Sequence, residues 1–183
     1  MFIKEIENSI LNDEIDVGIH SMKDVPATGM CDDLEIICWS KRAPQNDVLI
    51  SNSGKSFFDL PKGSIIGTSS IRRRAQVLSL RKDLKIKLLR GNVDTRIKFL
   101  KERKYDAIIL SLAGIQRLGV EKSATEVLDK NLFLPPACQG VIGVQAKKES
   151  PLKNLFSKIN CKQSQITSHA ERRVLKKINA NCN

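Results

Sequence analysis

Six short apolar runs along the chain are typical of β-strands, and helical patterns separate many of them. The runs cover residues 16–20, 34–39, 64–66, 84–89, 107–112 and 141–146. Residues 107–110 are continuously apolar, which predicts a strand buried on both faces. Strands that alternate with helices favour parallel pairing through crossover helices, so the pattern predicts an α/β fold.

Two helical patterns lie near the ends of the chain. Residues 1–11 set apolar side chains at helical spacing among Lys and Glu, unlike the basic start and apolar core of a signal peptide. Residues 164–178 place apolar side chains along one face of a long helix. We expect that face to dock on something beyond the end of the chain.

Two segments rich in turn-forming residues divide the chain: residues 41–47, with Ala43-Pro44, and residues 134–140, with Pro135-Pro136. They predict two crossings between two lobes. Residues 45–134 then form the second lobe, while residues 1–44 and 135–160 form the first. A cleft between α/β lobes is a common ligand site, because loops from both sides can close over a small molecule.

The charge balance predicts a negatively charged ligand. The chain has 31 Lys and Arg against 20 Asp and Glu, a net charge of +11, which raises the local concentration of anions. Nucleic acid is disfavoured because no aromatic side chain is interleaved with the basic clusters for base stacking. A small polyanion fits the charge as well, and pairs such as Lys147-Lys148 also fit plain solvated surface.

Other features of the composition argue against several kinds of site. No run of about 18 apolar residues is present to span a bilayer, so membrane insertion is disfavoured. The five cysteines are odd in number and contain no C-x-x-C pair, which disfavours a disulfide framework or a zinc site. His20 and His169 are too far apart in sequence to suggest a metal pair. We expect a cytoplasmic protein with reduced thiols.

The first candidate site is the turn Gly67-Thr68-Ser69-Ser70-Ile71-Arg72-Arg73-Arg74, which follows the strand at residues 64–66. Its hydroxyls can cap a helix whose exposed N–H groups and positive dipole end attract anions. Three consecutive arginines are otherwise unfavourable beside a positive helix terminus. The turn therefore predicts an anion site, the alternative being that the arginines merely point into water.

The second candidate, Leu89-Arg90-Gly91-Asn92-Val93-Asp94-Thr95-Arg96, repeats this logic. Asn92 can cap the helix that follows, and Asp94 is favourably placed in its first turn. Guanidinium groups bind carboxylates by two parallel hydrogen bonds, so arginines on neighbouring loops could bind a ligand that carries several carboxylates.

The third candidate is His20-Ser21-Met22-Lys23-Asp24-Val25-Pro26, directly after the first predicted strand, where a loop of an α/β lobe would face the cleft. Lys23 can bind an anion. Asp24 is the only acid in the loop and can stabilise a developing positive charge or transfer a proton. Taken alone, Asp24 could equally cap a turn.

In their order along the chain, these three strings resemble three signatures of the hydroxymethylbilane synthase family, also called porphobilinogen deaminases. Further similarity lies at residues 105–110, 114–119, 136–143 and 170–172, so the resemblance covers essentially the whole chain. It implies a two-lobed α/β architecture with parallel-rich sheets, like that of periplasmic binding proteins. It also implies a monomeric transferase of tetrapyrrole and haem biosynthesis, without a metal, that joins four porphobilinogen molecules into hydroxymethylbilane and releases ammonia.

The resemblance further implies a dipyrromethane cofactor, made from two porphobilinogens and attached to one cysteine through a thioether. Cys182 matches that position, although Ala180-Asn181 stands where the family often has Gly-Gly. By the same match, Asp24 is catalytic, because it would stabilise positive pyrrole intermediates and assist proton transfer. The cofactor would be held by Lys23, Asp24, Thr68, Ser70, Arg72, Arg73, Arg90, Asn92 and Arg96. Substrate would be bound by Arg96, Arg117 and Gln139.

The ends of the chain depart from the family pattern. The family usually has a further strand, helix and strand before the segment that matches Phe2, and it continues past the cofactor cysteine into a small third domain. We therefore expect an incomplete first lobe with an apolar edge at residues 16–19, and a third domain that begins at residues 161–183. Two other interpretations stay open, an inactive remnant of the family and a non-enzymatic binder of polyanions.

Overall fold

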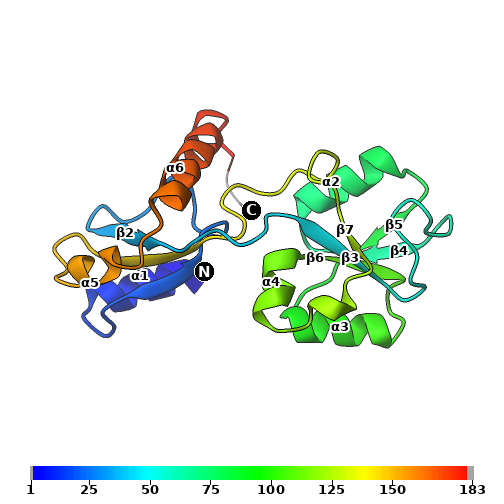
Figure 1. Ribbon diagram of the computed structural model, residues 1–183, viewed down its shortest axis with the longest axis horizontal. Helices are drawn as coiled ribbons and strands as arrows, with labels where there is room; N and C mark the ends of the chain where they lie inside the picture. The colour runs from blue at the N-terminus through cyan, green and yellow to red at the C-terminus, as the bar shows by residue number, and fades with distance from the viewer. Residues whose placement is uncertain (1, 181–183) are drawn as a thin grey trace. The chain divides into compact units, whose positions relative to one another are not determined.

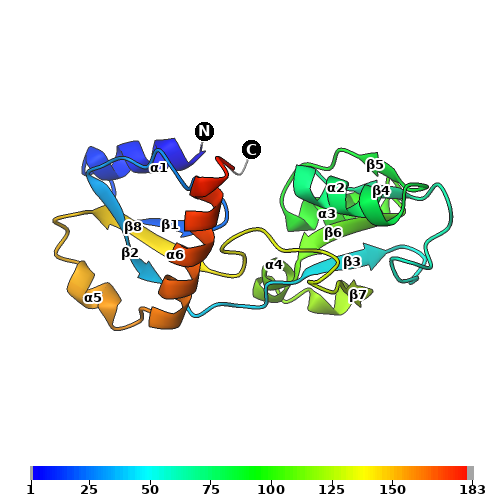
Figure 2. The same cartoon turned by 90° about the horizontal axis from the view of Figure 1, so that it is seen from above.

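The computed structural model describes residues 2–180 of the chain. It divides into two compact units: unit 1 comprises Met1–Ala43 and Pro136–Asn183, and unit 2 comprises Pro44–Pro135. The chain thus leaves unit 1 once, forms the whole of unit 2 and returns. The helices and strands of each unit are seen from two directions in Figure 1 and Figure 2.

Unit 1 is built on a three-stranded sheet with the strand order β1-β8-β2. Its elements are α1 (Phe2–Leu11), β1 (Gly18–Ser21), β2 (Leu34–Trp39), β8 (Ile142–Lys147), α5 (Lys153–Ser157) and α6 (Lys162–Lys177). The central strand β8 runs antiparallel to both neighbours. Because β8 belongs to the returning segment, the sheet joins the two parts of the chain that form unit 1.

The core of unit 1 lies between this sheet and the loops next to it. The buried cluster consists of Met22, Val25, Ile36, Trp39, Cys138 and Val141. Where the two crossing segments meet, the Ala43 N–H donates to the Gly140 carbonyl over 3.0 Å. Gly140 has a φ of +89°, and a Cβ there would lie 2.3 Å from the Ala43 oxygen, so this position requires glycine. The two crossing segments are therefore closely paired.

Unit 2 contains a five-stranded sheet with the strand order β5-β4-β6-β3-β7. Its elements are β3 (Asp47–Ser51), β4 (Ile65–Gly67), α2 (Ile71–Leu80), β5 (Lys85–Lys87), α3 (Val93–Lys101), β6 (Ala107–Ser111), α4 (Leu112–Arg117), the 3-10 helix η1 (Glu121–Ser123) and β7 (Glu126–Val127). Strand β4 is parallel to β5 and β6, whereas β3 is antiparallel to β6 and β7. The sheet is therefore mixed.

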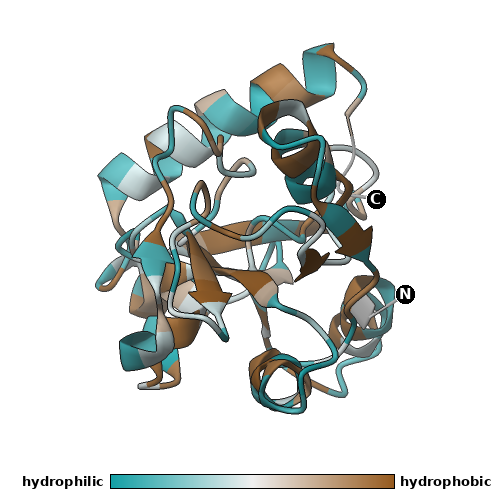
Figure 3. Ribbon diagram, turned by 90° about the vertical axis from the view of Figure 1, so that its right-hand side faces the viewer, coloured by the Kyte–Doolittle hydropathy of each residue, from teal (hydrophilic) through white to brown (hydrophobic). Residues whose placement is uncertain are grey.

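The buried strand β6 shows how unit 2 forms three layers. Ala107 and Ile109 pack in a cluster with Val77 of α2, whereas Ile108 packs in a cluster with Leu100 of α3. Successive side chains of a strand point to opposite faces of its sheet. Helix α2 therefore covers one face and α3 the other, as Figure 1 shows, and the strands are mostly hydrophobic in the colouring of Figure 3.

The predicted α/β class is confirmed, and each of the six apolar runs overlaps a strand. Pairing is more mixed than predicted, because parallel pairs occur in unit 2 while both pairings of the unit 1 sheet are antiparallel. Strands β3 and β7 were not predicted. Ile19 of the edge strand β1 is 65% exposed, and the incomplete first lobe stays a prediction. The third domain at residues 161–183 stays a prediction.

Candidate functional site

Three strand ends of unit 2 meet at one edge of its sheet. The parallel strands β4 and β6 end at Gly67 and Ser111, and the antiparallel strand β3 begins at Asp47. The register places Asp47 directly opposite Ser111. The Gly67 turn singled out from the sequence therefore starts at the same edge as the carboxylate of Asp47.

The turn after β4 forms the capped helix start that its hydroxyls predict. The Thr68 hydroxyl accepts a hydrogen bond from the Ser70 N–H over 3.1 Å, and the Ser70 hydroxyl accepts one from the Arg73 N–H over 3.3 Å. These bonds satisfy N–H groups that a helix leaves without intrahelical partners. They fix the first turn of α2, and with it Arg72 and Arg73, at the edge of the sheet.

Arg72 and Arg73 both bind the carboxylate of Asp47. Arg73 donates from Nε over 3.0 Å and from Nη2 over 2.7 Å, and Arg72 donates from Nη2 over 2.7 Å. The Arg73 side chain is 8% exposed and the Asp47 side chain is fully buried. The two arginines therefore do not simply point into water, as the alternative interpretation of the turn required, whereas Arg74 is exposed.

The pKa of Asp47 reflects these contacts. Burial by itself raises the pKa, but the hydrogen bonds and charge of Arg73, followed by those of Arg72, outweigh burial and lower the pKa below its ordinary value of 3.8. Asp47 is therefore a carboxylate at neutral pH. The sequence motifs did not point to it, since a single acid at the start of an apolar strand is a weak signal.

The second predicted loop has the geometry that its sequence suggests. The Asn92 side chain caps α3 by accepting from the Thr95 N–H over 2.8 Å. Gly91 has a φ of +111°, in the region that favours glycine, and its carbonyl accepts from Arg96 Nε over 2.7 Å. This bond holds the Arg96 guanidinium beside the loop, in which Arg90 is exposed.

The two loops begin side by side, because the adjacent parallel strands β4 and β5 that precede them end in register at Gly67 and Lys87. Burial, and then the positive charge of Arg73, lower the pKa of Arg96. Arg96 on α3 is thus close enough to Arg73 on α2 for their charges to interact. Like charges held together are costly unless an anion joins them. We call Asp47, Arg72, Arg73 and Arg96 the unit 2 cluster.

Unit 1 brings together three residues from the third candidate loop and the returning segment. Lys23 Nζ donates to the buried Gln139 Oε1 over 3.3 Å, and Asp24 follows Lys23 with an exposed side chain. The Asp24 N–H donates to the Ser21 carbonyl over 2.9 Å, which closes the turn. We call Lys23, Asp24 and Gln139 the unit 1 cluster. It offers a cation, an acid and an amide from loops 116 residues apart.

Helix α6 fixes both loops of the unit 1 cluster. Arg172 donates to the carbonyls of Val25 and Pro26 over 2.8 and 2.6 Å. Glu171 accepts two hydrogen bonds of 2.6 Å from Arg42, whose Nε donates to the Gln139 carbonyl over 3.1 Å. These supporting contacts span 97 to 147 residues, so the spacing of the motifs could not reveal them.

Two predicted site residues remain, Arg117 and Cys182. Arg117 is exposed in the last turn of α4. Cys182, the predicted point of cofactor attachment, lies outside the described residues. The roles of both residues stay predictions.

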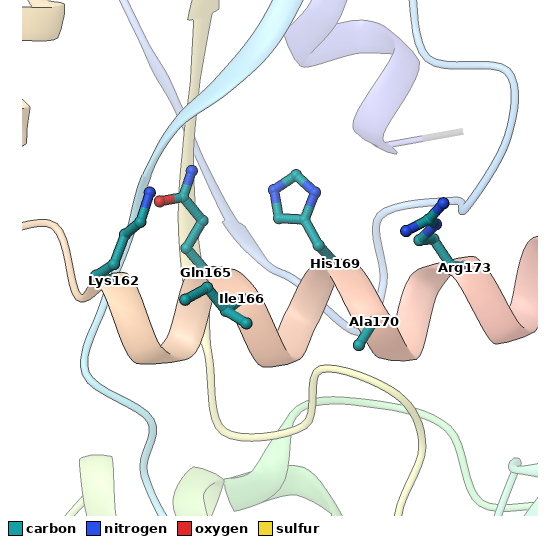
Figure 4. A pocket seen from close by; sticks show the side chains of 6 residues that line it. All are labelled: Lys162, Gln165, Ile166, His169, Ala170 and Arg173. Carbon is teal, nitrogen blue, oxygen red and sulfur yellow. The ribbon is translucent and has the colours of Figure 1, made fainter.

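A shallow groove along α6 contains none of the predicted site residues. It is lined by Lys162, Gln165, Ile166, His169, Ala170 and Arg173, which are shown in Figure 4. The His169 ring also packs against Trp39, with 5.1 Å between the ring centres. Because all six lining residues come from one helix, the groove lacks the convergence of separate loops that both clusters show.

Metal-holding groups and membrane-spanning helices are both missing among residues 2–180. Within that part of the chain, no group of three or more His, Cys, Asp and Glu side chains is arranged to hold a metal ion. Over the same residues, no helix combines the length and the apolar character needed to cross a membrane.

The fold and the two clusters define a class of protein: a two-unit α/β protein whose loops present cations suited to carboxylates. Solved structures support this fold. A putative methionine-binding lipoprotein from Bacillus subtilis is 15% identical with a TM-score of 0.55, covering 89% of this chain and 77% of its own. The reduced regulatory domain of OxyR2 from Vibrio vulnificus is 13% identical with a TM-score of 0.50, covering 90% and 76%.

Within this class, the chain belongs to the porphobilinogen deaminase family. Residues 1–153 match the family model described as "Porphobilinogen deaminase, dipyromethane cofactor binding domain". The porphobilinogen deaminases of Bacillus mycoides (strain KBAB4) and Bacillus cereus (strain AH820) are each 45% identical to it over 184 aligned positions. The alignments cover 100% of this chain and 59% of each relative, so the chain spans about three fifths of their length.

Proposed function

We propose that this chain takes part in the synthesis of hydroxymethylbilane from four porphobilinogen molecules. In each step, the C–N bond to the amino group of porphobilinogen breaks, a C–C bond to the growing chain forms, and ammonia and a ring proton leave. The observation that carries the proposal is the unit 2 cluster. It presents guanidinium groups at the starts of α2 and α3, which follow the adjacent strands β4 and β5, and the carboxylate of Asp47 binds Arg72 and Arg73.

The unit 2 cluster suits the carboxylates of a pyrrole chain. Each added pyrrole brings an acetate and a propionate, so a tetrapyrrole needs several cationic partners. Arg72, Arg73 and Arg96 can donate further N–H groups, because a guanidinium carries five donors in a fixed fork. Arg90 lies in the same loop as Asn92 and adds another cation. Exposed Arg117 is proposed to bind the incoming substrate.

The residues of this chain also suit a dipyrromethane cofactor. When bound, that group supplies the pyrrole carbon to which the first substrate is joined. Its carboxylates would be bound by Lys23, Thr68, Ser70, Arg72, Arg73, Arg90, Asn92 and Arg96, and Cys182 would carry it through a thioether.

Asp24 is proposed to act on the reacting pyrrole. Its exposed carboxylate directly precedes Val25 and Pro26, whose carbonyls accept from Arg172, and it lies one residue from Lys23. A carboxylate so placed can stabilise the positive charge that develops on the pyrrole and accept the ring proton. We further propose that the protein works as a cytoplasmic monomer.

Incubation of the chain with porphobilinogen tests this proposal. Ammonia should be released, and intact and peptide mass spectra should show a covalent addition at Cys182. Cys182→Ser should abolish the addition, and Asp24→Ala should reduce ammonia release more than cofactor attachment. A chain that is folded by circular dichroism, yet releases no ammonia and gains no mass, would reject the proposal in favour of a remnant or a non-enzymatic binder.

A further inference from the structure

Asp47 is an unexpected group to find beside a site for carboxylates. It is a fully buried acid that receives three guanidinium hydrogen bonds of 2.7 to 3.0 Å. A negative charge next to an anion site repels the ligand, so charge alone would make its presence unfavourable for binding. Its contacts therefore call for a different explanation.

The hydrogen bonds that Arg72 and Arg73 make to groups other than Asp47 suggest an explanation. Arg73 Nη1 donates to the Ile109 carbonyl over 2.9 Å, and Arg72 Nη1 donates to the Leu134 carbonyl over 2.6 Å and to Gln76 Oε1 over 2.8 Å. Each guanidinium is thus bound both by Asp47 and by a backbone carbonyl. Since the group is planar, contacts from two directions fix its orientation.

We propose that Asp47 is a positioning residue, which orients Arg72 and Arg73 so that their remaining N–H groups face an incoming carboxylate. The inference rests on the proposed function, because it assumes that the unit 2 cluster binds the carboxylates of a pyrrole chain. Arg side chains have many rotamers, and ordering them before the ligand arrives lowers the entropic cost of binding. Asp47 itself touches no reacting atom.

One substitution distinguishes a positioning role of Asp47 from a purely electrostatic role, because the two roles predict opposite changes in ligand affinity. In Asp47→Asn the side chain keeps its shape and loses its charge. If Asp47 acted only through its charge, the variant would bind a carboxylate ligand more tightly than the original chain. If Asp47 positions the arginines, the variant should bind more weakly, because an amide can accept from fewer N–H groups and its NH2 opposes a guanidinium.

The experiment uses the full chain and a dipyrromethane that carries two acetates and two propionates. Calorimetry should give a dissociation constant at least about tenfold higher for Asp47→Asn, a loss of about 1.4 kcal/mol. Affinities are compared at a temperature where both proteins are folded by circular dichroism. Asp83→Asn is the matched control, since Asp83 pairs with Arg81 at the other end of α2. It should bind like the original chain.

A measurement on the unaltered chain keeps the inference testable if Asp47→Asn does not fold. In NMR spectra of the guanidinium groups, Arg72 and Arg73 should show slow rotation and slow hydrogen exchange, whereas the exposed Arg74 should show averaged signals. Free rotation at Arg73 would overturn the inference.

The outcomes also separate this inference from the proposed function. Binding by the original chain with equal or tighter binding by Asp47→Asn would refute the role of Asp47 and leave the proposed function standing. If the original chain does not bind the dipyrromethane, the role of Asp47 and the proposed function both fail. Slow rotation at Arg73 would in that case show that Asp47 and Arg73 form an ion pair with a structural role only.

Discussion

The two units differ in how they carry charge. Unit 2 contains 18 Lys and Arg against 9 Asp and Glu, a net charge of +9, whereas unit 1 contains 13 against 11, a net charge of +2. Nearly all of the excess that the sequence shows is therefore in one unit. Unit 2 gathers cations at helix starts, and unit 1 offers a lysine, an acid and a buried amide.

The units also differ in how deeply their central ion pairs are buried. In unit 2 the Asp47 side chain is fully buried and Arg73 is 8% exposed, whereas in unit 1 Glu171 is 33% exposed and Arg42 is 15% exposed. A buried charge that loses its partner is far more costly than an exposed one. The comparison indicates that the stability of the unit 2 cluster depends on the single carboxylate of Asp47, whereas several contacts together stabilise the unit 1 cluster.

The largest expected effect follows from removing that carboxylate. Asp47→Ala leaves two guanidinium groups without their shared acceptor and should lower the free energy of unfolding by about 3 to 5 kcal/mol. Urea unfolding followed by circular dichroism measures this. Asp83→Ala removes an exposed acid from a pair with Arg81 and should have a much smaller effect. Equal effects of the two substitutions would contradict the difference in burial.

Acid should remove the charge of Asp47 without removing its side chain. The pKa of Asp47 is lower in the folded chain than its ordinary value of 3.8, so the folded state binds fewer protons than the unfolded state in the interval between them. This stabilisation is present above about pH 4 and is lost as the pH falls through the folded pKa. Unfolding midpoints measured between about pH 2 and 5 should therefore fall less steeply for Asp47→Asn.

Glu171→Gln should have an intermediate effect on unit 1. The pKa of Glu171 is lowered because hydrogen bonds from Arg42 and from the Cys138 N–H, together with the charge of Arg42, outweigh burial. The amide keeps one acceptor, and water can reach the partly exposed side chain. We expect a loss of about 1 to 2 kcal/mol by urea unfolding. A loss as large as that of Asp47→Ala would remove the distinction between the units.

The smallest effect is expected at the helix caps. Ser70→Ala and Asn92→Ala each remove the side chain that accepts from the third helical N–H, and each should cost about 1 kcal/mol. Asn92→Gly should cost only a few tenths of a kcal/mol, because glycine is tolerated at this position. If Ser70→Ala had no effect on thermal unfolding, the cap would not contribute to fixing the arginines that follow it.

Local sequence predicted much of the candidate site. Ser70 and Asn92 are typical helix caps that follow strands, and the structure has both at helix starts. Buried strand β6 was equally evident from its continuous apolar residues. Strand β7 has two residues and is too short to produce a periodic pattern. Strand β3 follows a segment rich in turn-forming residues, which favoured a turn over a strand.

The amino-acid sequence by itself determined the α/β class, the two capped helix starts and the excess of cations, because these depend on residues close together along the chain. Only the tertiary structure decided that Asp47 binds both Arg72 and Arg73, and that Arg172 binds the carbonyl of Pro26, just after Lys23 and Asp24, from 146 residues away. Such partners are chosen by strand order and register, which bring distant segments to one edge of a sheet. A single acid or arginine carries no local signal of the partner that folding will give it.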